Sequence, residues 1–183
     1  MLLRIIDVIL SGIALIFSAP IILVLMILGF LDTGSPFFIQ ARIGRSQKAF
    51  NMIKFRTMKK ETLSVPTHLA DSSDITNFGK FLRKSKLDEL PQLWNVIKGE
   101  MSIVGPRPCL PTQLELIKER ELHGVFEVRP GITGLSQVNA IDMSTPQLLA
   151  ETDAKMIEAL SFITYCKLIL MTIRGEGFGD RMR

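Results

Sequence analysis

An uncharged apolar run at positions 8–31 constrains the fold of this chain more than any other feature. With 24 residues, the run is long enough to enter or cross the hydrocarbon layer of a membrane. From residue 32 onward, charged residues occur throughout, as expected for a water-facing domain. The sequence therefore predicts two parts: a membrane-anchoring helix over residues 1–31, and one compact domain over residues 32–183.

The apolar run could be a cleaved signal, a spanning helix or a re-entrant helix. Only Arg4 supplies positive charge before the run, Asp7 interrupts the apolar N-terminus just ahead of the run, and a signal core is shorter, so a cleaved signal is not expected. Pro20 predicts a kink near the middle, where the hydroxyl of Ser18 can bond to a backbone carbonyl. Basic residues precede and follow the run, which favours one cytoplasmic side for both ends. We expect a re-entrant membrane helix, with a kinked span as the alternative.

Composition restricts the partners of the domain. The net charge is +4, a mild basic excess that suits an anionic membrane surface and phosphate-bearing substrates. We expect no nucleic acid partner, because the basic residues are interleaved with carboxylates and no aromatic platform or groove-reading helix is recognisable. Cys109 and Cys166 lie far apart without metal-binding spacing. They predict neither a disulfide nor a zinc site, which fits a reducing cytosolic environment.

Apolar patterning beyond the anchor predicts an α+β fold that is mostly helical with a small β element. Residues 36–43 and 50–58 are rich in Phe and Ile and predict a strand pair, while the polar residues 59–74 predict a loop. Helical spacing predicts three further helices, over residues 76–87, 111–123 and 148–160. Residues 160–173 are apolar but too short to span a membrane. They form either a buried core helix or an interfacial amphipathic helix beside the anchor.

Residues 86–108, with the sequence KLDELPQLWNVIKGEMSIVGPRP, carry the strongest chemical signal. Two adjacent carboxylates, Asp88 and Glu89, follow a basic cluster, and a rigid Pro-Arg-Pro turn presents Arg107 at the other end. A carboxylate can hold Mg²⁺ or attack phosphorus, and a guanidinium can bind two phosphate oxygens at once. A local alternative is that Asp88 merely caps a short helix in which Pro91 occupies the first turn.

Three blocks in order behind an apolar N-terminus resemble the small monotopic phosphoglycosyl transferases, a family of bacterial sugar transferases. The blocks are KFRTM at 54–58, the segment at 86–108 and RPGITGL at 129–135, and the resemblance extends to about residue 173. It also implies a kink centred on Ser and Pro in the anchor. The chain departs from the family after Gln137, where an Asn-Gly-Arg-Asn-like stretch is replaced by VNAIDM. What is known of sugar recognition in the family therefore does not carry over directly.

The resemblance implies an activity, its partners and its location. A sugar 1-phosphate would pass from a UDP-sugar to polyprenyl (undecaprenyl) phosphate with release of UMP, as the first membrane step of a glycoconjugate pathway. The enzyme would lie among membrane lipids on the cytoplasmic face of the bacterial inner membrane, and a homodimer is left open. Asp88 would attack the sugar-bearing phosphorus and form an aspartyl phosphosugar intermediate. Glu89 would assist, and Mg²⁺ held by Asp88 and Glu89 would bridge the diphosphate.

The matched blocks and the divergent stretch supply the expected substrate-binding residues. Arg107 is the foremost candidate because the flanking prolines fix its backbone. For Arg56 and Arg129, a structural ion pair is an equal alternative, and Gly131 and Gly134 predict a tight turn. The full set comprises Lys54, Arg56, Arg83, Pro106, Arg107, Arg129, Asn139 and Asp142.

Two other classes of function compete with a transferase. The chain could be a non-enzymatic membrane adaptor, in which the anchor holds a basic domain that recruits partners. It could also be a metal-dependent lipid phosphohydrolase. That chemistry usually needs more metal-binding carboxylates than this region shows, since Asp71 and Asp74 lie in the expected loop.

Overall fold

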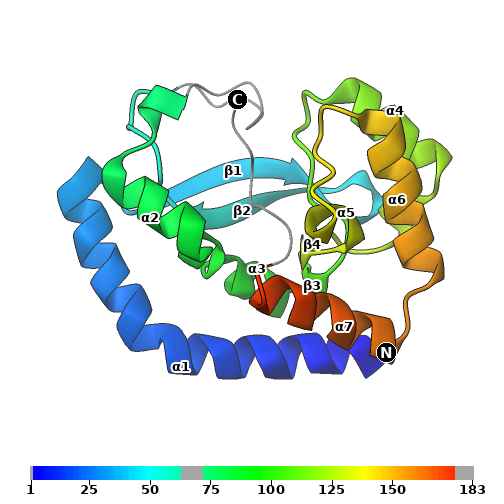
Figure 1. Cartoon of the computed structure of the whole chain (residues 1–183), viewed down its shortest axis with the longest axis horizontal. Helices are drawn as coiled ribbons and strands as arrows, with labels where there is room; N and C mark the ends of the chain where they lie inside the picture. The colour runs from blue at the N-terminus through cyan, green and yellow to red at the C-terminus, as the bar shows by residue number, and fades with distance from the viewer. Residues whose placement is uncertain (1, 63–71, 176–183) are drawn as a thin grey trace.

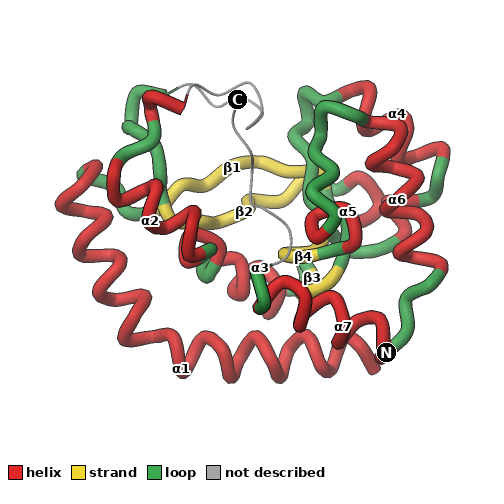
Figure 2. The backbone as a smooth tube through the Cα atoms, viewed as in Figure 1, coloured by secondary structure: helices red, strands yellow, loops and turns green. Residues whose placement is uncertain are grey.

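The N-terminal helix α1 (Leu2–Thr33) runs along one edge of the molecule, bends partway along its length and continues along a second side (Figure 1). This computed structural model describes residues 2–62 and 72–175. The expected fold class, mostly helical with a small β element, is confirmed (Figure 2). The elements that follow α1 are β1 (Phe37–Ile43), β2 (Ala49–Phe55), α2 (Asn77–Ser85), α3 (Gln92–Lys98), β3 (Ser102–Val104), α4 (Leu114–Leu122), β4 (Gly131–Thr133), α5 (Leu135–Val138), α6 (Pro146–Glu158) and α7 (Phe162–Ile173).

The bend in α1 has a cause in its sequence. Pro20 lies inside the helix and has no N–H, so the carbonyl of Ile16 loses its helical partner and the helix kinks. The hydroxyl of Ser18 donates to the carbonyl of Leu15 over 3.5 Å, which is a long bond and lies one residue before the carbonyl that Pro20 leaves. The kink is confirmed. By length and composition, α1 is also apolar enough to cross a membrane.

The first limb of α1 is attached to the domain through a buried carboxylate. Asp7 is 3% exposed. It accepts hydrogen bonds from the hydroxyl of Ser102 at 2.9 Å, the backbone N–H of Ile103 at 2.8 Å and the hydroxyl of Tyr165 at 2.6 Å. Arg4 donates to the carbonyl of Ile97 over 3.1 Å. These bonds join the start of α1 to α3, β3 and α7.

The second limb of α1 packs on the same domain through apolar side chains. Leu25 lies in a buried cluster with Phe55 of β2 and Leu82 of α2. A Cβ on Gly29 would lie 3.2 Å from the backbone of Pro36, so this glycine lets the chain pass closely as it leaves the helix. Both limbs of α1 therefore contact one domain, which lies inside the bend (Figure 1).

The predicted strand pair is confirmed. Strands β1 and β2 are antiparallel, with Phe37 opposite Phe55 and Ile43 opposite Ala49. The ring of Phe55 is fully buried and stacks on that of Phe37 at 5.3 Å between centroids. The hairpin crosses the middle of the molecule between α2 and the pair α4 and α6 (Figure 2).

A second sheet joins two of the sequence blocks. Strands β3 and β4 are parallel, with Ser102 beside Gly131 and Val104 beside Thr133. The prediction of a tight turn at Gly131 and Gly134 is wrong, because Gly131 lies in a strand and the backbone at Gly134 is extended. A Cβ at these positions would lie 2.0 and 2.4 Å from backbone atoms of Gly105. The glycines therefore allow the GPRP and RPGITG segments to touch.

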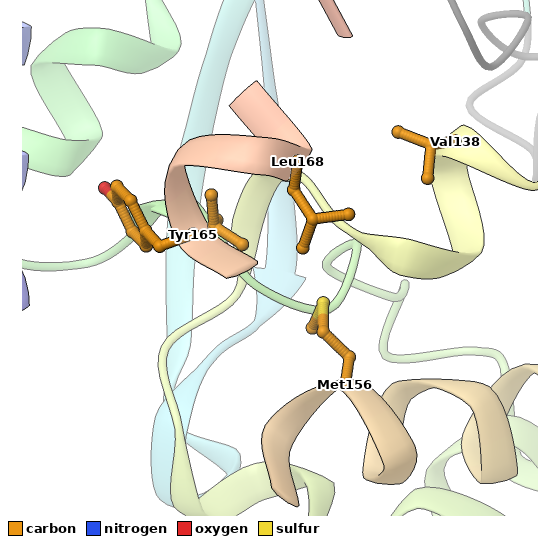
Figure 3. Close-up of a cluster of buried hydrophobic side chains, with 5 residues drawn as sticks. Val138, Met156, Tyr165 and Leu168 are labelled. Carbon is orange, nitrogen blue, oxygen red and sulfur yellow. The ribbon is translucent and has the colours of Figure 1, made fainter. Parts of the chain in front are cut away.

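The C-terminal helix α7 has two different faces. Tyr165 and Leu168 are buried, and Leu168 points toward Met156 of α6 (Figure 3). The opposite face exposes large apolar side chains, those of Phe162, Ile163, Leu170 and Ile173. The expectation of a buried core helix is thus correct for one face only. The predicted helices near residues 76–87, 111–123 and 148–160 are confirmed as α2, α4 and α6. The predicted loop at 59–74 lies partly outside the described residues.

Candidate active site

Asp88 and Glu89 lie where the chain turns from α2 into α3. Lys86 adopts a left-handed conformation with φ 57°, and the 3₁₀ turn η4 (Leu87–Glu89) follows at once. Asp88 is 8% exposed. The N-cap residue of α3 is Pro91, and no side chain makes a capping hydrogen bond there. The local alternative that Asp88 caps this helix is therefore wrong. Successive side chains of a 3₁₀ turn point about 120° apart, so Asp88 and Glu89 face different directions.

Glu89 faces the Pro-Arg-Pro turn. Its Oε1 lies 3.7 Å from Nη1 of Arg107. Both side chains are about three-quarters covered, which strengthens their attraction relative to an exposed pair. Together they line a small cavity whose other walls are Arg42, Met52, Gln92, Pro108, Gly131 and Ile132. The structure thus brings one carboxylate of the pair together with the arginine from the end of the same motif, and their roles stay predictions.

Arg83 ties the KFRTM block to the last turn of α2. Its Nε donates to the hydroxyl of Thr57 over 2.9 Å, and Thr57 is buried. Gly79 makes this approach possible, because a Cβ there would lie 2.0 Å from the carbonyl oxygen of Thr57. Arg83 therefore lies at the end of the helix that leads directly into η4 and Asp88.

Arg56 and Arg129 hold backbone segments. The guanidinium of Arg56 donates to the carbonyl of Ser35 over 3.1 Å, and that of Arg129 donates to the carbonyl of Gly99 over 2.8 Å. Burial lowers the pKa of Arg129, as do the nearby cations. Both cations of the KFRTM block also make cation–π contacts with Phe38: Nζ of Lys54 lies 5.6 Å from the ring centre, and Cζ of Arg56 lies 5.5 Å from it. These contacts favour a structural role for Arg56 and Arg129, through backbone carbonyls instead of the expected ion pairs.

The divergent stretch forms the loop between α5 and α6. Asn139 is exposed, and Ala140 has a left-handed φ of 56° that usually requires glycine. Ile141 packs against the buried cluster of Cys109, Leu116 and Leu149. Ile141 thus anchors this loop to the domain through apolar packing. Asp142 accepts a hydrogen bond from the backbone N–H of Ser144 over 2.8 Å and shapes the loop.

The donor set fits Mg²⁺ only with help from a substrate. In the part of the chain that the structure describes, no three His, Cys, Asp or Glu side chains converge on a metal site. Mg²⁺ is often bound through one or two carboxylates together with substrate phosphates and water. Asp88 and Glu89 could contribute to such a site only if a substrate supplied phosphate oxygens beside them.

Sequence reasoning missed a buried ion pair between α4 and α6. Nη2 of Arg120 lies 2.7 Å from Oδ2 of Asp153, and the two side chains are 2% and 0% exposed. Burial raises the pKa of the Asp153 carboxyl, while the attraction of Arg120 opposes this change. A signal was present in the sequence, because Arg120 follows the buried Leu116, and Asp153 the buried Leu149, by four residues on a helix. A charge at an apolar helical position indicates a buried pair.

Comparison with known proteins places the chain among sugar transferases. A family model described as bacterial sugar transferase matches residues 1–176. The chain is 41% identical over 145 residues to the uncharacterized sugar transferase EpsL of Bacillus subtilis, covering 79% of this chain and 71% of that protein. It is 33% identical over 185 residues to the exopolysaccharide production protein ExoY of Rhizobium meliloti, covering 91% and 81%.

A third relative carries a more specific description. The chain is 40% identical over 149 residues to the UDP-glucose:undecaprenyl-phosphate glucose-1-phosphate transferase of Xanthomonas campestris pv. campestris. The match covers 78% of this chain but 31% of that protein. The chain thus spans about a third of this longer relative, in contrast to the shorter ones.

Proposed function

The chain belongs to the bacterial sugar transferase family, and we propose that it transfers a sugar 1-phosphate from a UDP-sugar to polyprenyl phosphate with release of UMP. The names of similar proteins from Xanthomonas campestris and Aeromonas hydrophila support this reaction class. The observation that carries the proposal is the meeting of Glu89 and Arg107 beside the buried Asp88. Family membership also argues against a membrane adaptor.

Asp88 forms and breaks the covalent bonds in both steps of this reaction. In the first step an oxygen of Asp88 bonds to the sugar-bearing phosphorus, the bond from that phosphorus to the bridging oxygen breaks, and UMP leaves. In the second step a phosphate oxygen of the lipid attacks the same phosphorus, and the Asp88 carboxylate leaves. The product is a polyprenyl diphosphate sugar. Asp88 and Glu89 would hold Mg²⁺, which when bound offsets the negative charge of the diphosphate.

Arg107 and Glu89 orient the reacting groups. The guanidinium of Arg107 can bind two oxygens of a phosphate at once, and the flanking prolines limit the entropy lost on binding. The carboxylate of Glu89, 3.7 Å from Nη1 of Arg107, holds that guanidinium beside the cavity that both residues line. Because Asp88 is almost fully covered, its attraction to a phosphate-bound cation is screened less than at the surface.

We further propose that α1 is re-entrant and that the domain lies on the cytoplasmic face of the bacterial inner membrane. A straight helix of 32 residues would be about 48 Å long and would carry its two ends to opposite sides of the hydrocarbon layer. Here Asp7 and Leu25 both contact one domain. The apolar faces of α1 and α7, which lie side by side (Figure 1), would enter the leaflet and hold Asp88 near the phosphate of the lipid.

The test is to incubate the purified protein with undecaprenyl phosphate, Mg²⁺ and a panel of UDP-sugars, with Asp88→Asn as control. We expect UMP from at least one donor and none above background from the variant. Release of UDP would show transfer of the sugar alone, and release of inorganic phosphate from the lipid would show a phosphohydrolase. Either result would overturn the proposal.

A further inference from the structure

The Pro-Arg-Pro turn is held by its carbonyl groups. Pro106 and Pro108 have no N–H, so this segment is anchored mainly where its carbonyls accept hydrogen bonds. Each of the four carbonyls from residue 106 to residue 109 does so. Two of the donors are backbone N–H groups, of Gly131 to Pro106 at 2.8 Å and of Ile43 to Cys109 at 2.9 Å.

The other two donors are buried arginine side chains. Nη1 of Arg42 donates to the carbonyl of Pro108 over 3.0 Å, and Nη1 of Arg120 donates to the carbonyl of Arg107 over 2.7 Å. The second bond is the more direct for the site, because it fixes the residue whose guanidinium meets Glu89. Arg120 thus holds the backbone of Arg107 without lining the cavity that Arg107 and Glu89 share.

Arg120 is itself held in place by two further helices. Its Nη2 donates to Asp153 of α6 over 2.7 Å, and Asp153 accepts from the hydroxyl of Ser136 in α5 over 2.6 Å. The helices α4 and α6 pack side by side (Figure 1), which brings the two charges together inside the domain. The guanidinium therefore bridges Asp153 and the Arg107 carbonyl with two different nitrogens.

Stability alone does not explain a buried ion pair at this place. Removing two charges from water costs several kcal/mol per ion, and apolar residues of similar volume often replace such a pair without loss of stability. An apolar pair could not donate to the Arg107 carbonyl. A lysine at position 120 would keep the charge but would lack the planar fork that reaches both acceptors.

We propose that the Arg120–Asp153 pair positions Arg107 for the substrate phosphate, so that Arg120 and Asp153 are positioning residues of the transferase. This inference rests on the proposed function. A displacement of about 1 Å in a group that binds the reacting phosphate can cost on the order of 100-fold in rate. Loss of the pair should therefore slow the chemistry while the domain stays folded.

The test compares the double variant Arg120→Met/Asp153→Leu, which leaves no unpaired buried charge, with the wild type. The control Thr152→Val removes a hydroxyl from the same helix that bonds only within it, to the carbonyl of Leu148. With UDP-sugar alone, we expect the double variant to release UMP with an unchanged burst amplitude and a rate constant lower by about 10- to 100-fold. A lower amplitude at an unchanged rate constant would show a purely structural role and would overturn the proposal.

Two further measurements separate this inference from the proposed function. In an Arg107→Lys background, removal of the pair should cost much less than in the wild type, because it acts through Arg107. An equal loss in both backgrounds would contradict the inference. Hydrogen exchange of a peptide covering residues 105–110 should be faster in the double variant and unchanged in Thr152→Val. If the wild type released no UMP, the proposed function would fail, while unchanged exchange would still overturn the positioning role.

Discussion

Replacement of Asp7 tests how the first limb of α1 is attached to the domain. Asp7→Leu removes the acceptor of one buried donor, on Tyr165, and of two partly buried donors, on Ser102 and Ile103. Burial and the bond to Asp7 raise the pKa of the Tyr165 hydroxyl, so it stays a donor at every physiological pH. A buried donor left without a partner costs about 1–3 kcal/mol. Three fully buried donors would cost roughly 3–9 kcal/mol, and because two of them are only partly buried we expect a loss in the lower part of that range, roughly 3–6 kcal/mol, which is a large part of the stability of a typical domain.

The measurement is urea unfolding in detergent micelles, followed by tryptophan fluorescence of Trp94. Asp32→Asn is the matched control, because Asp32 lies near the other end of α1 and accepts a bond from Thr76 in an exposed position. The control should change the free energy of unfolding by less than about 1 kcal/mol. If Asp7→Leu were as stable as the control, the buried bonds of Asp7 would not hold the limb, and the reasoning would be refuted.

Three further substitutions test the anchor and the site. Pro20→Leu restores a helical hydrogen bond and should straighten α1. In intact cells, an impermeant thiol reagent should then label a cysteine at position 2, while a cysteine at position 60 stays shielded. Shielding of both cysteines would contradict this prediction. Glu89→Gln removes the charge that holds Arg107 and should lower UMP release at least about 10-fold with an unchanged melting temperature; near-normal release would count against the pairing. Arg107→Lys keeps the charge but loses the fork, so the KM for the UDP-sugar should rise about 10-fold, and an unchanged KM would remove Arg107 from substrate binding.

The parts of the fold that follow from local patterns were predictable. Alternation predicted the β1–β2 hairpin, helical spacing predicted α2, α4 and α6, and Pro20 predicted the kink. Each of these depends on residues that are near one another in the chain. The motif spanning residues 86–108 also named both partners of the Glu89–Arg107 contact, because it carries them at its two ends.

The rest depends on contacts between distant segments. The spacing of Arg120 from Leu116 and of Asp153 from Leu149 places each charge on an apolar helix face, but only the packing of α4 on α6 shows that the two charges meet. In the sequence Asp7 only interrupts the apolar N-terminus, and the bonds that it accepts from β3 and α7 depend on residues about 100 or more positions away. Glycine is common in turns, so the sequence predicts a turn at Gly131. Only the strand pairing reveals that this glycine makes room for the backbone of Gly105.

The central claim is that Asp88 carries the sugar phosphate during the reaction, and intact-protein mass spectrometry tests it most directly. The protein is incubated with its UDP-sugar in the absence of polyprenyl phosphate. Covalent catalysis predicts a mass increase equal to one sugar phosphate, about one UMP per active site, and neither signal in Asp88→Asn. Release of UMP only when both substrates are present, or a tenth of wild-type turnover in Asp88→Asn, would contradict the claim.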